Sequence, residues 1–395
     1  MAETDTLKSG VRIPRTVWVL GLVSMLMDIS SEMIHSLLPV FIVTVLGASA
    51  TTVGAIEGVA EATALIAKVF SGTVSDYVGK RKWLATFGYG LAALTKPMFA
   101  LAGSVGWVFT ARFIDRIGKG IRGAPRDALI VDVTPPGIRG AAFGLRQALD
   151  TAGAFTGPLL AIGLMWLWND NFRAVFWAAV IPAFLALGLL VIGVREPDSV
   201  RQNGNGSFPI SRTALGRLPF DYWWVVMVGA VMTLARFSEA FLVLRALQGG
   251  LAIALIPLVL IVMNAVYALC AYPFGALADT MPRPTLLTLG IVPLIGADLV
   301  LAHSGQLAWL MAGLALWGVH MAATQGLLAA MVADVAPEDL RGTAFGFFNL
   351  ASGLSMLIAS ALAGVLWDRL GAPATFFTGA AFASVALLLL MLRRH

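Results

Sequence analysis

The sequence predicts an all-α membrane protein of twelve transmembrane helices, arranged as two pseudo-symmetric six-helix bundles. The first observation is composition: 58% of the 395 residues are hydrophobic and only 12% are charged, whereas soluble domains carry about 25% charged residues. The second is length, because a helix needs about 20 apolar residues to cross a bilayer, so twelve helices use most of the chain. The third is an internal repeat that relates the two halves. No room is left for a sizeable soluble domain.

Apolar segments separated by short polar stretches give the expected spans. In the first half we expect them at residues 16–46, 51–75, 83–102, 105–131, 140–166 and 172–194. In the second half we expect them at residues 222–247, 251–278, 285–303, 306–333, 343–369 and 373–392. The resulting domains are an N-terminal bundle over 1–194, a cytoplasmic linker over 195–221 and a C-terminal bundle over 222–395. The first segment lacks a small-residue cleavage site, so we expect a retained helix rather than a signal peptide.

Two motifs recur about 202 positions apart. Residues 139–144 read Arg-Gly-Ala-Ala-Phe-Gly, and residues 341–346 read Arg-Gly-Thr-Ala-Phe-Gly. Residues 72–76, Gly-Thr-Val-Ser-Asp, return as Gly-Ala-Leu-Ala-Asp at residues 275–279. Two halves with the same membrane orientation indicate a parallel duplication, in which a substrate path is expected at the interface between the halves.

Lys and Arg residues gather at one set of helix ends. This set comprises Lys8, Arg12, Arg15, Lys80, Arg81, Lys82, Arg122, Arg126, Arg139, Arg195, Arg201, Arg212, Arg217, Arg283, Arg341, Arg393 and Arg394. The opposite ends hold little beyond Arg173, Arg245 and Arg369. Because loops rich in Lys and Arg stay in the cytoplasm, we expect both termini there, in a bacterial inner membrane. This orientation explains the net charge of +5, so no nucleic-acid partner is expected.

Ionisable residues inside the spans are costly in lipid and therefore mark candidate functional positions. Asp28 and Glu32 lie one turn apart in the first span, and two neighbouring carboxylates in a low dielectric favour the protonated form of one of them. That property suits a proton-coupling site. Two other interpretations stay open: a structural ion pair with Arg112 or Arg116, or direct contact with a substrate.

Other intramembrane residues are candidates for binding a substrate. They are Arg116 in the fourth span, Arg146 and Asp150 in the fifth, and Arg236 and Glu239 in the seventh. Arg146 and Asp150 are four residues apart, so an intrahelical pair is the alternative. Glu57 and Glu61 either belong to the site or lie at a water-exposed rim.

Two further ionisable side chains have a structural alternative. His35 either joins a proton relay or packs as a hydrogen-bonded core residue. Asp298 is expected to be structural, close to the outer interface. The single Cys270 excludes a cysteine-based metal cluster, and no metal site is expected.

The loop after the second span carries a motif of known type. Gly72, Asp76, Gly79, Lys80 and Arg81 match the pattern Gly-x-x-x-Asp-x-x-Gly-Arg/Lys-Arg. The chain thereby resembles the major facilitator superfamily over essentially its whole length. The resemblance implies the twelve-helix fold and a gating role for these five residues in a transporter.

Two helices carry motifs that resemble the drug/proton antiporters of that superfamily. In the fifth span Gly144, Gly153, Gly157 and Pro158 fall in register with the antiporter signature, while Ala161-Ile162 stands where the signature ends in Gly-Gly. Such small residues form a groove for a neighbouring helix, and the resemblance implies a gating role for Gly153, Gly157 and Pro158. The fourth span begins the family's Arg-Phe pattern at Arg112, with Asp115 and Arg116 replacing Gln and Gly; the resemblance implies that Arg112 assists proton transfer.

These observations predict a proton-coupled secondary active transporter that exports a small anionic or zwitterionic molecule by alternating access. Its expected partners are protons, the substrate and membrane lipid; a monomer without a cofactor is expected. One alternative is an uptake permease for an anionic metabolite or metal chelate, with Arg112, Arg116 and Arg236 as an anion clamp. Another is a divalent-metal or metalloid transporter that uses Asp28, Glu32 and His35 as ligands. An enzyme is not expected, because the sequence has no nucleophile elbow, phosphate loop or His-Glu-x-x-His motif.

Overall fold

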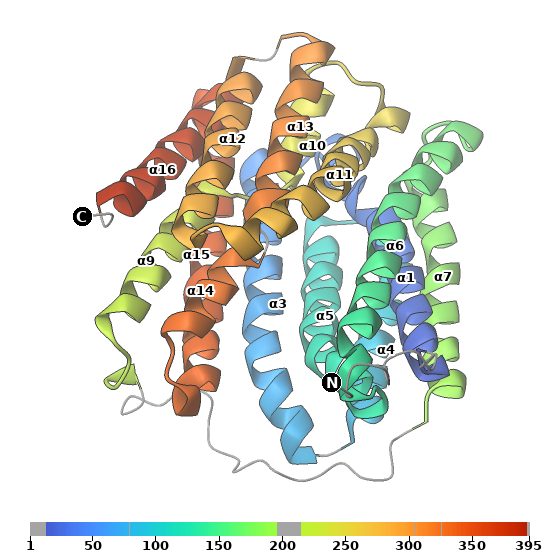
Figure 1. Ribbon diagram of the computed structural model, residues 1–395. Coiled ribbons are helices and arrows are strands. Elements are labelled where there is room, and N and C mark those ends of the chain that lie inside the picture. Colours follow the sequence, from blue (N-terminus) through green and yellow to red (C-terminus); the bar gives the residue numbers. More distant parts are fainter. Residues whose placement is uncertain (1–12, 79, 196–214, 304, 325, 393–395) are drawn as a thin grey trace, which may run out of the picture.

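Figure 1 shows a computed structural model of the chain, which describes residues 13–78, 80–195, 215–303, 305–324 and 326–392. Within these ranges the secondary structure is helical, with no strand, as the all-α prediction requires. The first half contains α1 (Arg15–His35), α2 (Leu38–Thr44), α3 (Ala50–Val78), α4 (Arg81–Ala100), α5 (Val105–Val133), α6 (Arg139–Leu167) and α7 (Phe172–Gly193). The second half contains α9 (Phe220–Ala235), α10 (Ala240–Gln248), α11 (Leu258–Thr280), α12 (Arg283–His303), α13 (Leu307–Thr324), α14 (Leu327–Val335), α15 (Arg341–Leu370) and α16 (Ala372–Leu392).

The helices coincide with the expected spans, and this confirms the predicted fold class. In the described part of the chain, nine helices or broken helix pairs are long and apolar enough to cross a membrane. The other three expected spans are α3, α4 and α5, which are 29, 20 and 29 residues long. These three are the helices that carry Glu57, Lys96 and Arg112. The intramembrane charge of the molecule is therefore concentrated in three consecutive helices.

Three spans that the sequence presents as continuous are broken. Span 306–333 contains α13 and most of α14, on either side of Gly326 at φ +78°. The other two breaks are related by the repeat. Residues 16–46 form α1 and α2, separated at Ser36 and Leu37; residues 222–247 lie within α9 and α10, separated by Arg236–Glu239. Ser36 and Ser238 are 202 positions apart, so the two breaks are equivalent in the repeat. A broken helix exposes backbone groups at membrane depth, which is tolerated only beside protein or a cavity.

The 202-residue repeat also holds in the packing. In the first half Gly88 of α4 lies against α5, where an added Cβ would approach the Cβ of Arg122 to 2.9 Å. In the second half Gly290 of α12 lies against α13, where an added Cβ would clash with Cγ2 of Thr324, the residue 202 positions after Arg122. Equivalent glycines therefore set the same helix crossing in both halves, and residues 202 apart occupy equivalent places.

The two halves meet tightly at one end of the α3–α15 contact. A Cβ added to Gly364 would lie 2.6 Å from the Cα of Thr51, one on Gly58 would lie 3.0 Å from the oxygen of Leu357, and one on Gly353 would lie 3.4 Å from the oxygen of Ala62. A Cβ added to Gly54 would also clash with the oxygen of Ser360, so the contact is tight from Thr51 to Gly54 and loosens toward Ala62. We call the tight end, near Thr51, the sealed end.

A side chain of one half caps a helix of the other at the sealed end. Asp368 of α15 accepts hydrogen bonds from the backbone N–H groups of Ala50 (3.1 Å) and Thr51 (2.8 Å), in the first turn of α3. A helix N-terminus has unpaired N–H groups and a partial positive charge, both of which a carboxylate satisfies. The cap exists only while the halves are in contact here.

The opposite end, where Arg81 and Arg283 lie, is called the basic end. Buried apolar residues of both halves form one continuous core that includes the sealed end. A second, separate core belongs to the first half alone, with Val17, Ala85 and Leu190 among its members. The halves therefore share a core around the sealed end, whereas the first half packs on itself toward the basic end.

Candidate functional site

A cavity of about 300 Å³ lies between the two halves at the level of the helix breaks. Its polar lining is contributed by α1, α3 and α5 from the first half and by the α9–α10 break from the second. The lining residues include Glu32, His35, Glu57, Glu61, Arg112, Arg116, Lys119, Arg236, Ser238 and Glu239, with Phe237, Val243, Leu260, Trp317 and Met356 as apolar members. The carboxylates and the Lys and Arg side chains in this lining balance, four against four.

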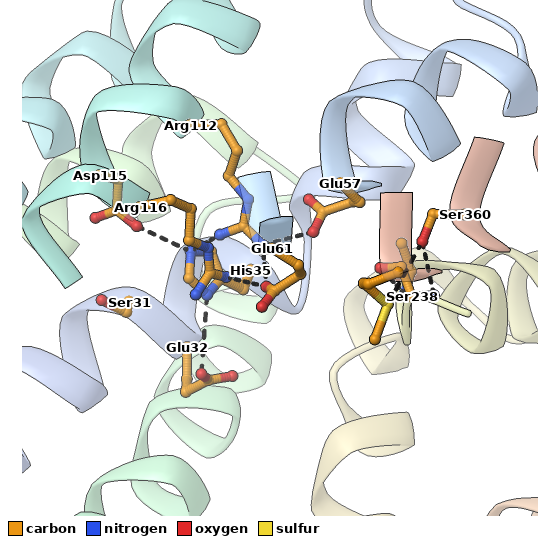
Figure 2. A network of polar contacts seen from close by, with 12 residues as sticks. Ser31, Glu32, His35, Glu57, Glu61, Arg112, Asp115, Arg116, Ser238 and Ser360 are labelled. Carbon is orange, nitrogen blue, oxygen red and sulfur yellow. Dashed lines mark hydrogen bonds and ion pairs between the residues drawn. The ribbon is translucent and has the colours of Figure 1, made fainter. Parts of the chain in front are cut away.

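Arg112 is the centre of the polar network on the side of the first half (Figure 2). Its Nη2 donates to Oε2 of Glu57 at 2.6 Å and lies 3.8 Å from Oε1 of Glu61, and its Nη1 contacts Nε2 of His35. Arg116 pairs with the same Glu61, at 3.1 Å. Arg112 and Glu57 are both almost fully buried, and a buried charge has a high free-energy cost unless it is paired. The guanidinium groups of Arg112 and Arg116 are therefore neutralised by Glu57 and Glu61 of α3.

Behind this network lies a second ion pair that the sequence reasoning missed. Lys96 of α4 is fully buried, and its Nζ donates to Oδ1 of Asp115 (2.9 Å) and to Oγ of Ser31 (3.1 Å). Oδ2 of Asp115 lies 3.8 Å from Nε2 of His35. His35 thus connects the buried pair to the cavity. The available signal was a single Lys within an otherwise apolar expected span.

Glu32 lies on the cavity surface and faces His35, with 3.8 Å between its Oε1 and Nδ1 of His35. It is seated against α6, because a Cβ added to Gly157 would lie 2.8 Å from the Cβ of Glu32. Gly153, one turn earlier, faces Asp28 in the same way, at 3.1 Å. The two glycines therefore allow α6 to approach α1 at the two carboxylates predicted for proton coupling.

The structure separates these two carboxylates. Glu32 lines the cavity, whereas Asp28 does not. Neither forms the ion pair with Arg112 or Arg116 that was one interpretation, since those two arginines pair with Glu57 and Glu61. The rim interpretation of Glu57 is wrong, because its side chain is 6% exposed and is held by Arg112.

The second half presents its charges from the α9–α10 break. Arg236 and Glu239 both line the cavity. The break is held by Ser238, whose N–H donates to Oγ of Ser360 (3.2 Å) and whose Oγ accepts from N–H of Ala240 (3.2 Å); Figure 2 shows this contact opposite the arginine network. Among the residues that the structure describes, neither Arg236 nor Glu239 has an ion-pair partner within 4 Å.

Arg146 and Asp150, predicted to bind substrate, are paired with each other instead of lining the cavity. Nη1 of Arg146 lies 3.2 Å from Oδ2 of Asp150 and 3.6 Å from Oδ1 of Asp127. This is the intrahelical alternative. In this conformation the pair contributes to the interior of the first half, so a role in binding substrate remains only a prediction.

The residues predicted to gate lie in two places. Gly153, Gly157 and Pro158 are buried in α6. At the basic end Arg81 pairs with Asp132 at 2.5 Å, and its second-half equivalent Arg283 pairs with Asp334 at 3.0 Å.

The rest of the loop motif surrounds Arg81. Gly72 packs near Ala124 of α5, with 3.8 Å between an added Cβ and that of Ala124, and Lys80 is exposed. The side chain of Asp76 and the whole of Gly79 lie outside the described residues.

Comparison with known proteins identifies the family. The family model described as Major Facilitator Superfamily matches residues 20–263 and 248–395. The chain belongs to this superfamily of membrane transporters. The uncharacterized MFS-type transporter MJ1317 of Methanocaldococcus jannaschii is 33% identical over 387 residues, which cover 96% of this chain and 95% of its own. The inner membrane transport protein YajR of Escherichia coli is 24% identical over 398 residues, covering 94% and 82%.

The superfamily fold is also seen among solved structures. The crystal structure of a POT family transporter in complex with a thioalcohol-conjugated peptide superimposes with a TM-score of 0.80 at 13% identity, covering 96% of this chain and 95% of that one. At that identity the likeness concerns the fold. The predicted superfamily is confirmed, and the chain is a secondary transporter by family, with no catalytic family indicated.

Proposed function

We propose that the protein is a proton-coupled exporter of a small zwitterionic or anionic organic molecule, working by alternating access. One observation carries the proposal: Arg112 and Arg116 are paired with Glu57 and Glu61, whereas Arg236 and Glu239 at the α9–α10 break have no ion-pair partner within 4 Å among the described residues. Lys119 of α5 also lines the cavity without such a partner in the described ranges. Arg236 offers a cation and Glu239 a carboxylate to a bound molecule. A ligand that carries both signs satisfies both groups, and a free charge left in a low dielectric is costly.

Glu32 is the proposed exchange site for protons. It lines the cavity, and His35 is the ionisable group nearest to it. With the substrate held at Arg236 and Glu239, protonation of Glu32 from the acidic side removes a negative charge that favours the cationic group of the substrate, so the substrate is released there. Arg112 holds Glu57 and Glu61 in place and keeps them out of this proton exchange. Asp28, seated on Gly153 one turn away, is the proposed next proton acceptor.

Export rather than uptake is supported by α6. Gly153, Gly157 and Pro158 are the residues that resemble the antiporter signature, and the two glycines pack directly on α1 at Asp28 and Glu32. The proposed membrane is a bacterial inner membrane, in which the basic end faces the cytoplasm. The cavity, closed at the sealed end, would then load from the cytoplasm.

The alternatives draw less support from the site. An anion clamp of Arg112, Arg116 and Arg236 would need two arginines that are already neutralised by Glu57 and Glu61. A metal transporter would need clustered ligands, and no group of three or more His, Cys, Asp or Glu residues suited to a metal occurs in the described ranges.

A ligand-stabilisation screen of the purified protein tests the substrate class. Amino-acid-like zwitterions, carboxylates and lipophilic cations are compared by the shift in melting temperature at two pH values. We expect zwitterions or anions to stabilise the protein, and the shift to vanish in Arg236→Gln while it persists in Arg369→Gln, which lies outside the cavity. Stabilisation by lipophilic cations that is indifferent to Arg236→Gln contradicts the proposal.

Proton coupling is tested with the best ligand of that screen in inverted vesicles. An imposed pH gradient should drive uptake into vesicles of the wild type and not into those of Glu32→Gln. Equal gradient-driven uptake by the two proteins excludes Glu32 as the coupling residue.

A further inference from the structure

The second half buries a carboxyl group that the proposed function does not use. Asp298 of α12 is 0% exposed. Neither of its oxygens has a hydrogen-bond partner in the part of the chain that the structure describes. Buried polar groups are nearly always paired, and an isolated buried carboxylate is far more costly than a neutral carboxylic acid. The sequence predicts a structural Asp298 close to the outer interface. That depth stays a prediction, and the burial of an unpaired acid needs an explanation of its own.

Asp298 lies directly behind the helix break that lines the cavity. A Cβ added to Gly379 of α16 would lie 2.7 Å from Oδ2 of Asp298 and 3.0 Å from Cε1 of Phe237. The carboxyl group of Asp298 and the phenyl ring of Phe237 therefore both lie against α16 at Gly379, where the helix has no side chain. Phe237 belongs to the α9–α10 break and lines the cavity. One aromatic side chain separates this acid from the transport path.

The repeat gives Asp298 a counterpart in the first half. Residue 96 plus 202 is residue 298, so Asp298 stands where Lys96 stands in α4. Lys96 is neutralised by Asp115 and linked to the cavity by His35. The equivalents of Asp115 and His35 are Trp317 and Phe237, whose rings lie 5.7 Å apart. The same buried place thus holds an ion pair in one half and a lone acid among aromatic rings in the other.

No neighbouring charge neutralises Asp298. The described ionisable groups on the elements around it are Arg236 and Glu239 in the break, Arg245 on α10, Tyr267, Cys270 and Tyr272 on α11, Arg283 and His303 on α12 itself, His320 on α13 and Asp334 on α14. His320 contacts the oxygen of Gly290, two turns away, and Arg245 donates to the oxygen of Leu301. Helix α16 has no ionisable side chain between residues 372 and 392. A metal cation would need several oxygen ligands, so the smallest cation, a proton, fits the site.

We propose that Asp298 is a proton-binding site of the second half, separate from the network around Arg112. The proton is bound as an O–H group on the carboxyl in the conformation seen here. It is released to water when movement of the α9–α10 break withdraws Phe237 and admits solvent. The transporter then carries a second proton site, and the release of its proton accompanies the movement of the broken helix.

Infrared difference spectroscopy of the purified full-length protein, between mildly acidic and alkaline pH, tests this proposal. The wild type should show a carboxylic-acid C=O band that disappears at alkaline pH, and Asp298→Asn should lack that band. A pH-indicator dye should count one proton fewer released by Asp298→Asn. The matched control is Asp334→Asn, an exposed acid of the same half, which should keep the buried-acid band.

Two results overturn the proposal: a spectrum of Asp298→Asn identical to that of the wild type, or a band that persists unchanged at alkaline pH. If Asp298→Asn does not fold, Gly379→Ala places a methyl group against the carboxyl and should shift the band; an unshifted band is equally contradictory. Glu32→Gln protein should retain the Asp298 band. Failure of this proposal and failure of the Glu32 assignment therefore give different spectra.

Discussion

Removing the carboxylate of Asp368 should open the sealed end. Its two hydrogen bonds to Ala50 and Thr51 cap α3 from the opposite half, so they are lost whenever the halves separate there. Replacing an N-cap acceptor by Ala costs about 0.5–2 kcal/mol, and a negative charge at a helix N-terminus contributes about 0.3–1 kcal/mol. The two contributions overlap, because the loss of a charged cap already includes part of the charge effect, so we take about 1–2 kcal/mol. This corresponds to a change of about five- to thirtyfold in the equilibrium between closed and open.

The assay is labelling of a cavity cysteine from the side of the sealed end. Val243 lines the cavity and is 2% exposed, so Val243→Cys is made in a Cys270→Ser background and labelled with a membrane-impermeant maleimide in right-side-out vesicles. Asp368→Ala should raise the labelling rate by about five- to thirtyfold. Asp368→Asn, which keeps one acceptor oxygen, should fall between this variant and the unaltered protein.

The control is Asp170→Asn, an exposed acid in the α6–α7 connection whose φ of +61° suits Asn as well as Asp. This variant should label at the original rate. Equal labelling rates in Asp368→Ala and the unaltered background would refute the idea that the cap holds the two halves together.

Two further predictions concern stability. Gly157→Ala forces a methyl group between α6 and the Cβ of Glu32 and should lower the free energy of unfolding by about 1–3 kcal/mol, seen as a lower melting temperature in detergent. The control is Gly163→Ala, where an added Cβ meets open space and the melting temperature should not change. An equal loss in both variants contradicts the packing argument. Lys96→Met leaves Asp115 as an unpaired buried charge and should cost about 3–5 kcal/mol. Lys96→Met with Asp115→Asn should recover most of this loss, and no recovery in the double variant contradicts a pairwise ion contact.

The sequence predicted the helices better than their breaks. Expected span 16–46 contains nearly all of α1 and all of α2, and span 222–247 contains most of α9 and most of α10. Hydropathy reports how apolar a segment is, and the residues around both breaks remain apolar enough to read as one span. The signals available were Pro39, two residues into α2, and the helix-weakening Ser238.

Pairing was the least predictable part of the site. Spacing placed Asp28 and Glu32 on one face of α1, but only Glu32 reaches the cavity. Periodicity gives the face of a helix and not the helix that it meets, so Glu57 was not recognised as the partner of Arg112. The role of Lys96 could not be predicted for the same reason, since Lys96 acts as the ion-pair partner of Asp115 in the next helix.

The concentration of charge in α3, α4 and α5 has a consequence for biogenesis. A Lys, Arg or Asp at the centre of an isolated helix opposes its transfer into lipid by about 2.5–3.5 kcal/mol. Glu57 finds Arg112, and Lys96 finds Asp115, only when α5 has been synthesised. These three helices should therefore leave the translocon together, as one unit. A nascent chain that ends after α4 would present Lys96 to lipid without its counter-ion.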